Sequence, residues 1–360
     1  MLAAYVSGHG FGHATRTGEV LRELASRPGA PSVSVASSAP EALFRAALGD
    51  GFEYRKLECD VGVAQRDALT LDERGTLARW REHAAGLEAQ VDAEARWLAG
   101  RGARVVLGDV PPLAFLAAAR AGLPSVALAN FSWDWIYRHL ARVVPELAHA
   151  ADAAADAYAT CGLLLRLPFA GEMGAFPTRA DVPLVARRPR LGRGEARRRL
   201  GLGGGPAVLV SFGGIGMPGP EPSVLGRIAA FEFVLFEPEG PLPGNVRGTS
   251  AAELARRGLG YADLVGAVDV VVTKPGYGIV SDAIGAGTRL VYTERGDFPE
   301  YPIMVREMAA YLPCAHVSNR DLFAGRLEPA LGEVLRAATP RAPDRGGAAR
   351  VAERLLELAG

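Results

Sequence analysis

The sequence predicts an α/β protein of two similar domains, each a parallel sheet covered by helices on both faces. Its 360 residues suit two domains of roughly 150 to 200 residues better than one core. Short runs rich in valine and leucine alternate with longer segments rich in alanine, arginine and leucine. This is the pattern of strands buried on both sides by helices. The alternation stops once, at residues 177–205, and then starts again.

The first expected domain covers residues 1–176. Apolar runs place its strands near 2–7, 32–36, 52–57, 104–108, 124–129 and 159–165. The segments between them place helices near 14–26, 40–47, 72–99, 111–121 and 133–155.

Residues 177–205 combine prolines, an arginine run and a glycine cluster, so we expect a linker with one short helix. The second domain is expected over 206–345, with strands near 206–214, 232–236, 269–273 and 289–293. The terminal segment 346–360 contains a helical stretch, from about 347 to 358, that is expected to pack on the first domain.

The composition narrows the function classes. With 49% hydrophobic residues, 22% charged residues and a net charge of +0, the chain has no basic footprint for nucleic acid. Its three cysteines lie far apart and form no CxxC pair, which fits a reducing cytoplasm. No apolar stretch approaches ~20 residues and no signal peptide is recognisable, so neither secretion nor a membrane span is expected. Peripheral contact with a membrane and the oligomeric state stay open.

The first motif, Ser7-Gly-His-Gly-Phe-Gly-His-Ala-Thr-Arg16, lies where the first strand passes into the first helix. Its glycines allow a sharp turn and a close approach to a ligand at the helix N-terminus. We therefore expect His9, Gly10, Phe11, Gly12 and His13 at the mouth of a cleft. An imidazole here suits a general base for an acceptor hydroxyl. Two alternatives are a structural turn whose histidines cap the helix and a zinc site, although no third zinc ligand is apparent.

The second motif follows the strand near 269–273 and begins the next helix. A helix N-terminus flanked by Lys274 is a natural seat for a diphosphate. The expected donor-binding residues are Lys274, Pro275, Gly276, Tyr277, Gly278 and Ser281, with the Asp282 carboxylate accepting from ribose hydroxyls.

Other candidate residues also follow strands and so lie at the same edge of a sheet. Asp297 and Glu300 suit sugar hydroxyls, although a solvated acidic loop would look the same. The turn after residue 210 could contact phosphate through Ser211, Gly213 and Gly214. In the first domain the candidates are Asp109, Asn130, Trp133 and Asp134, the last three facing an acceptor or packing in the core.

Together these motifs resemble the GT-B glycosyltransferases that transfer N-acetylglucosamine to peptidoglycan precursors, and the related galactolipid synthases. The sequence is most similar to the N-terminal glycosyltransferase-like domain of the L-arabinokinases. The resemblance rests on four motifs in the same order: Gly8-His-Gly-Phe-Gly-His-Ala-Thr-Arg16, Asp109-Val-Pro-Pro112, Asn130-Phe-Ser-Trp-Asp-Trp-Ile-Tyr137 and Lys274-Pro-Gly-Tyr-Gly-Ile-Val-Ser-Asp282. It spans nearly the whole chain.

The resemblance implies a GT-B fold and a UDP-sugar donor bound mainly by the C-terminal half. His13 takes the place of the catalytic histidine, Asp282 that of a ribose-binding glutamate, and Glu300 that of a sugar-contacting glutamine. Because the last two differ from the family pattern, the identity of the sugar does not carry over.

The expected activity is an inverting transfer of a sugar to an unknown acceptor hydroxyl, with His13 as the base, Asp109 assisting it, and no metal or other cofactor. A UDP-sugar epimerase of the same fold and a non-catalytic nucleotide-sugar-binding module remain as alternatives. No ATP loop of the kinase type is found, so kinase activity is not expected.

Overall fold

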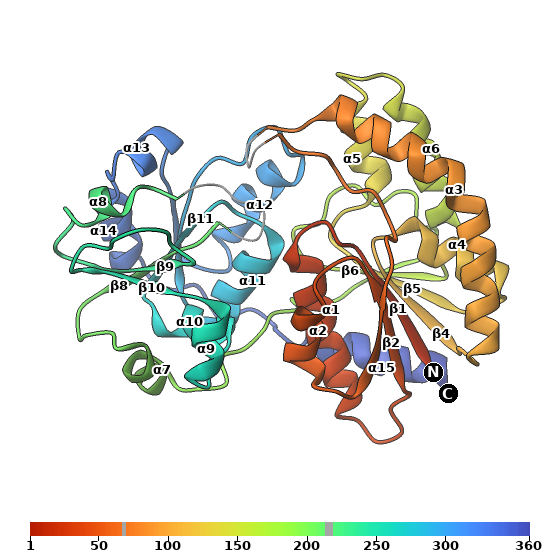
Figure 1. Ribbon diagram of the computed structural model, residues 1–360, viewed down its shortest axis with the longest axis horizontal. Helices are drawn as coiled ribbons and strands as arrows, with labels where there is room; N and C mark the ends of the chain where they lie inside the picture. Colours follow the sequence, from red (N-terminus) through yellow and green to blue (C-terminus); the bar gives the residue numbers. More distant parts are fainter. Residues whose placement is uncertain (67–69, 213–218) are drawn as a thin grey trace.

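The computed structural model describes residues 1–66, 70–212 and 219–360. The chain forms two lobes side by side, each built around its own sheet (Figure 1). All strand pairs within the two sheets are parallel. The α/β fold with two domains that the sequence predicts is therefore confirmed.

The first sheet has the strand order β3-β2-β1-β4-β5-β6-β7 in the described residues. Its strands are β1 (Leu2–Val6), β2 (Val33–Ser37), β3 (Phe52–Lys56), β4 (Val105–Asp109), β5 (Ser125–Ala129), β6 (Leu163–Arg166) and β7 (Arg179–Asp181). The helices of this lobe are α1 (Phe11–Ala25), α2 (Glu41–Leu48), α3 (Glu73–Gly100), α4 (Pro112–Arg120), α5 (Trp133–Leu140) and α6 (Leu147–Ala159).

Alternate residues of β1 enter two different apolar clusters, because successive side chains of a strand point to opposite faces. Leu2 and Val6 pack in the cluster that contains α1, α2 and α15 (Gly347–Ala359), whereas Ala3 and Tyr5 pack in the cluster that contains α3 to α6. Both faces of the sheet are thus covered. This leaves the strand ends as the open edges of the lobe.

The second sheet has the order β10-β9-β8-β11-β12-β13 in the described residues. Its strands are β8 (Ala207–Val210), β9 (Glu232–Phe236), β10 (Val246–Thr249), β11 (Val270–Thr273), β12 (Arg289–Tyr292) and β13 (Cys314–His316). The helices are α8 (Pro222–Leu225), α9 (Ala251–Arg256), α10 (Tyr261–Ala267), α11 (Tyr277–Ala286), α12 (Glu300–Met308), α13 (Asn319–Phe323) and α14 (Glu328–Arg336).

The chain crosses between the lobes twice. The first crossing leads from β7 to α7 (Arg193–Leu200), which packs on α10 of the second lobe. The second leads back to α15, which packs on α1 and lies under the first lobe, near both termini (Figure 1). The crossings touch each other, since a Cβ on Gly347 would lie 2.1 Å from the Pro183 carbonyl oxygen. A glycine is required at this position for the two crossings to meet.

The structure differs from the sequence prediction in four places. The single helix expected over 133–155 is two helices, α5 and α6, and Pro145 lies in the break. Proline removes a backbone donor and disfavours helical geometry in the preceding residue. The expected linker contains a strand, because β7 pairs with β6. The edge strands β10 and β13 were not predicted; they are short and less apolar than the strands between them.

Within the described ranges, none of the helices combines the length and hydropathy that a membrane span requires.

Candidate active site between the two lobes

Each of the two glycine-rich motifs begins a helix directly after a central strand of its sheet, α1 after β1 and α11 after β11. Gly10 is the N-cap of α1 and has a φ of 87°, which residues with a Cβ rarely adopt. Gly276 is the N-cap of α11, after β11. Because glycine has no side chain to cap a helix, no side chain of the cap residue accepts from the N–H groups of either first turn.

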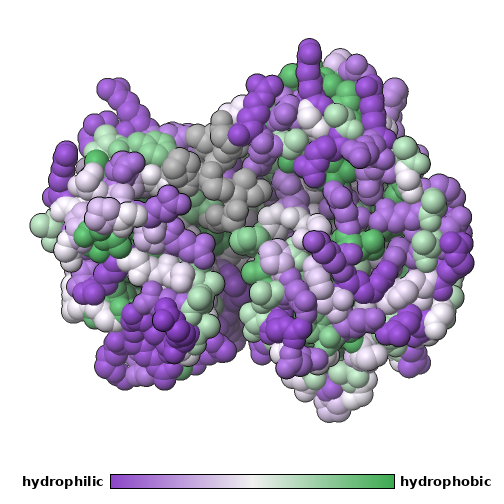
Figure 2. Space-filling view, viewed as in Figure 1, coloured by the Kyte–Doolittle hydropathy of each residue, from purple (hydrophilic) through white to green (hydrophobic). Residues whose placement is uncertain are grey.

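These two helix beginnings touch each other across the lobes. A Cβ on Gly278 would lie 3.1 Å from the Cα of Gly12, so the backbones meet where neither residue has a side chain. Beside this contact the guanidinium of Arg16 lies over the Tyr277 ring, 5.0 Å from its centroid. A furrow separates the lobes on the face seen in Figure 2. The structure thus brings the two sequence motifs to one interface.

His13 and Asp109 form a buried hydrogen-bonded pair. Val6 and Asp109 are paired at the ends of β1 and β4, and His13 follows on the first turns of α1. The distance from His13 Nδ1 to Asp109 Oδ1 is 2.8 Å, and the two residues are 6% and 0% exposed. An ionised carboxylate only accepts, so Nδ1 carries the hydrogen in this pair, and in the neutral ring the lone pair is then on Nε2. Nε2 can then act as a base.

Asp109 is fully engaged by its neighbours. Arg16 donates to Oδ2 from Nε at 2.8 Å and to Oδ1 from Nη2 at 2.5 Å. Thr17 donates its hydroxyl to Oδ2 at 2.6 Å. Burial alone raises the pKa of Asp109, but the charges and hydrogen bonds of Arg16 and His13 outweigh it and hold the pKa well below 3.8. Asp109 is therefore an anion throughout the neutral range.

The same arginine reaches the second lobe through one amide. Arg16 Nη1 donates to Asn130 Oδ1 at 2.6 Å, and Asn130 Nδ2 donates to Glu300 Oε1 at 2.6 Å. Glu300 is 4% exposed, and its other oxygen lies 3.4 Å from Arg295 Nη1. The residues predicted to contact an acceptor and a sugar thus bond to each other in this structure.

The loop before α12 docks on the first lobe. Phe298 is 3% exposed and packs in the apolar cluster of α3 to α6. Asp297 is largely exposed, and its carboxylate lies 3.1 Å from His139 Nε2 of α5. The reading of this segment as a solvated acidic loop is therefore wrong for Phe298 and Glu300, which are buried in the contact between the lobes.

The pKa of His9 shows that several basic groups surround the site. Burial first, and then the electrostatic effects of His13 and of the cations Arg295, Arg79 and Lys274, lower the pKa of His9 to about 3. His9 is thus neutral near pH 7, and basic groups from both lobes lie close enough to act on one ring. This concentration of positive charge suits a diphosphate.

The donor residues of the second lobe are mostly packed or paired. Tyr277 is buried and its hydroxyl lies 3.4 Å from the backbone of Val185, while Pro275 is buried and Gly276 half-buried. The Ser281 hydroxyl donates to the Gly278 carbonyl at 2.9 Å. Gly213 and Gly214 lie outside the described residues.

Asp282 is not presented as a free carboxylate. It is 3% exposed, and both its oxygens accept from Arg187 of the first crossing, Oδ1 at 3.0 Å. The Arg187 guanidinium lies 5.4 Å from the centroid of Tyr261, whose hydroxyl bonds to Ser211 Oγ at 2.8 Å. A ribose would therefore compete with Arg187 for this carboxylate.

Trp133 does not offer a face to an acceptor, so its assignment to the cleft is corrected. It is 0% exposed and stacks on Tyr137, and its Nε1 donates to Asp60 Oδ2 at 2.7 Å. Its ring instead meets the edge of His9, with centroids 5.4 Å apart. Asp134 is partly buried, which raises the pKa of its carboxyl. Phe11, 44% exposed, is the apolar side chain that remains open at the motif.

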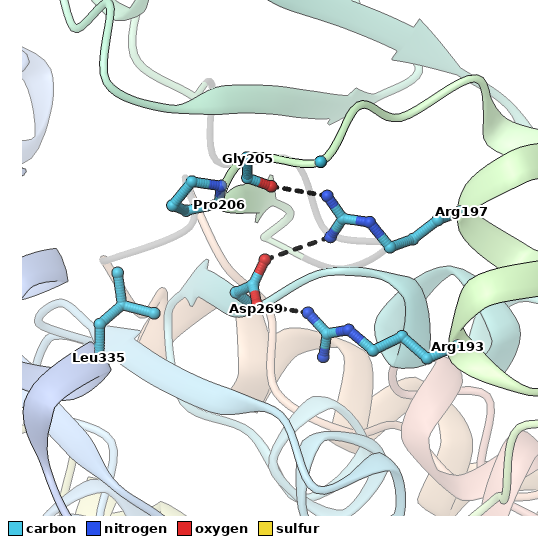
Figure 3. A pocket seen from close by; sticks show the side chains of 7 residues that line it. Arg193, Arg197, Gly205, Pro206, Asp269 and Leu335 are labelled. Atoms are coloured by element: carbon cyan, nitrogen blue, oxygen red, sulfur yellow. Dashed lines mark hydrogen bonds and ion pairs between the residues drawn. The ribbon is translucent and has the colours of Figure 1, made fainter.

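A shallow, open pocket of about 320 Å³ lies elsewhere (Figure 3). Arg193 and Arg197 of α7 reach Asp269, and Arg197 also donates to the Gly205 carbonyl (Figure 3). These residues precede β8 and β11, so the pocket is at the amino edge of the second sheet, opposite the helix beginnings. We do not assign it to the reaction.

Sequence reasoning missed several residues of the site, chiefly Arg16, Asp60, Arg187 and Arg295. Arg16 could have been found, because it lies three residues after His13 and therefore on the same helical face. Arg187 carried no signal, since its contact depends on the path of the crossing.

Comparisons with known proteins add to this geometry. No family model matches the chain. It is 34% identical over 352 residues to the L-arabinokinase of Arabidopsis thaliana, covering 92% of this chain but 32% of that protein. The chain thus spans about a third of the length of this curated relative.

Solved structures with the same architecture are glycosyltransferases. The kitacinnamycin glycosyltransferase has a TM-score of 0.62 at 19% identity, over 100% of this chain and 95% of that one. The glycosyltransferase SnogD from Streptomyces nogalater has a TM-score of 0.58 at 18% identity, over 100% and 99%. The chain has the GT-B fold. The Phytolacca americana protein UGT2 shares it, with a TM-score of 0.62 at 13% identity, over 99% and 94%.

Proposed function

We propose that the chain is a glycosyltransferase that binds a nucleotide-diphosphate sugar, a UDP-sugar, between its lobes and transfers the sugar to an acceptor hydroxyl. One observation carries the proposal: the buried His13–Asp109 pair lies at the place where the uncapped beginning of α11 meets α1. The GT-B neighbours support it, and one of them was solved with UDP-2fluoro-glucose and pterostilbene.

The proposed reaction is a direct displacement. Nε2 of His13 takes the proton of the acceptor hydroxyl while its oxygen forms a bond to the anomeric carbon. The bond from that carbon to the diphosphate oxygen breaks, and the diphosphate leaves with the electron pair. Attack from the side opposite the leaving group inverts the anomeric configuration. Asp109 holds the ring and stabilises the imidazolium that forms.

Protein cations are proposed to stabilise the departing diphosphate in place of a metal. Lys274 and Arg295, which act electrostatically on His9, and the N–H groups of the first turn of α11 supply the positive charge. We expect transfer to proceed undiminished in excess EDTA. A rate that EDTA abolishes and Mg²⁺ restores would contradict this part of the proposal.

The test is a screen of nucleotide sugars by thermal shift, followed by turnover with candidate acceptors and NMR of the product. We expect a UDP-sugar to raise the melting temperature, and the product to carry the inverted anomer. Retained configuration would overturn the displacement, and turnover of the sugar nucleotide without any acceptor would indicate an epimerase.

A second candidate is a module that binds a nucleotide sugar without transferring it. The similarity to L-arabinokinase favours this candidate, because that protein is named as a kinase and this chain matches only about a third of it. UDP-sugar binding with no transfer to any acceptor, and no effect of His13→Ala, would support this candidate instead. For either function we propose a cytoplasmic location, where the three unpaired cysteines stay reduced.

A further inference from the structure

A continuous chain of buried side chains joins the His13–Asp109 pair to the second lobe. It runs from His13 through Asp109, Arg16 and Asn130 to Glu300. Each link is 2.5 to 2.8 Å long, and every member is at most 6% exposed. Desolvated hydrogen bonds of this kind are strong when complete and costly when one member is lost.

Arg16 is the branch point of this chain. Its three nitrogens contact Asp109 and Asn130, and its guanidinium packs on the Tyr277 ring of the second lobe. The pKa of Arg16 is raised in spite of burial, because Asp109 and also Tyr277 and Glu300 stabilise the cation. Arg16 therefore contacts the second lobe directly at the Tyr277 ring and indirectly through Asn130, which bonds to Glu300. The charge of Glu300 also acts on Arg16.

The contact between Asn130 and Glu300 joins the two lobes, so it depends on whether the lobes are closed against each other. Asn130 follows β5 of the first lobe, and Glu300 begins α12 of the second. Phe298, two residues earlier, is anchored in the first lobe. The position of Glu300 is thus set by how the lobes meet.

We infer that Arg16 is a positioning residue that holds the His13–Asp109 pair in its reactive geometry only while Asn130 and Glu300 join the lobes. This inference rests on the proposed function. It adds that the base is coupled to lobe closure, so that a general base is in place when the donor is enclosed.

The test is a double-mutant cycle of Arg16→Lys and Glu300→Ala. Lysine keeps a positive charge beside Asp109 but lacks the three-nitrogen fork by which the guanidinium donates to both Asp109 oxygens and to Asn130 at once. Arg16 and Glu300 have no hydrogen bond or ion pair to each other; both bond to Asn130. If the two substitutions act independently, their effects on kcat should therefore multiply. If both act through the chain of side chains from His13 to Glu300, which we call the relay, their effects should not multiply.

We expect each single variant to lower kcat about tenfold or more. The kcat of the double variant should lie no more than about threefold below that of the less active single variant. For Arg16→Lys the KM for the donor should change far less than kcat. Because a loss of folded protein also lowers the apparent kcat at unchanged KM, kcat is expressed per folded protein, with the folded fraction measured by circular dichroism. If Glu300 acts only by contacting the sugar, its effect persists in the Arg16→Lys background, and the relay is overturned. Glu307→Ala, at a partly exposed position of the same helix where the carboxylate pairs only with the exposed Arg306, is the matched control.

The same double-mutant cycle can be measured without a substrate, by using the free energy of unfolding in urea in place of kcat. If the wild-type chain transfers no sugar, the proposed function fails, but non-additive unfolding free energies still support the relay between the lobes. If it does transfer sugar and the kcat effects are additive, the proposed function stands and the relay is overturned. Additive effects in both measurements overturn it as well.

Discussion

At the scale of single residues, the ion pair between Asp109 and Arg16 controls how the site responds to mutation. Asp109→Asn would leave the Arg16 guanidinium buried without its counter-charge, so we expect a loss of ~3–5 kcal/mol in unfolding free energy. Urea denaturation followed by circular dichroism measures it. Asp181→Asn breaks the exposed pair with Arg166 and should cost less than ~1 kcal/mol. Equal losses in the two variants would contradict the geometry of the site.

The pH dependence of stability tests the same carboxylate. The folded pKa of Asp109 lies below its ordinary value of 3.8, so its stabilisation is fully present above that value and is lost as the pH falls toward the folded pKa. The difference in unfolding free energy between wild type and Asp109→Asn should therefore shrink between pH 6 and pH 3. A difference that stays constant over this range would show that the pKa of Asp109 is not depressed.

The pairing of His13 with Asp109 could be predicted, because His13 comes shortly after β1 and Asp109 ends β4, and the two strands end at the same edge of a sheet. The pairing of Asp282 with Arg187 could not, because no pattern in the sequence gives the path of the crossing. Trp133 shows a different limit. An aromatic residue after a strand suits a cleft and a core equally, and only packing decides between them.

At the scale of the elements, the site depends on the close contact between the first turns of α1 and α11, where glycines take the place of side chains. Gly278→Ala would place a methyl group 3.1 Å from Gly12 Cα, which forces the lobes apart by a few tenths of an ångström and should cost ~1–3 kcal/mol. Thermal unfolding and UDP binding would both weaken. Gly86→Ala, in exposed and open space on α3, should instead stabilise by ~0.5–1 kcal/mol. Stabilisation by both changes would refute the close contact.

Middle strands were easier to predict than edge strands. The strands β1, β4, β8 and β11 are paired on both sides and buried, so they are nearly all valine, leucine and alanine, whereas β10 and β13 pair on one side. The strands that position the site therefore left the clearest signal.

At the scale of the whole molecule, α15 returns from the second lobe and braces the first. Leu355 is 0% exposed in the cluster that includes α1, so Leu355→Ala should cost ~2–5 kcal/mol. Hydrogen exchange should show the loss of protection in α1 and little change in α14. Loss confined to the second lobe would contradict this packing.

The fold of the whole molecule could be predicted because the alternation of strands and helices restarts after residue 205, and because four motifs occur in the same order as in the glycosyltransferase-like domain of the L-arabinokinases. The way the lobes meet was not, since it depends on Asn130, Glu300 and Phe298, whose partners lie in the other lobe.

The most direct test of a donor site between the lobes is the affinity of UDP for lysine and histidine variants, measured by calorimetry. The chain has two lysines, Lys274 beside α11 and Lys56 at the exposed end of β3. We predict that Lys274→Ala weakens UDP binding ~10-fold or more, while Lys56→Ala and His13→Ala bind UDP like the wild type and only His13→Ala abolishes transfer. Equal affinity of Lys274→Ala and Lys56→Ala for UDP would contradict the proposed seat of the diphosphate.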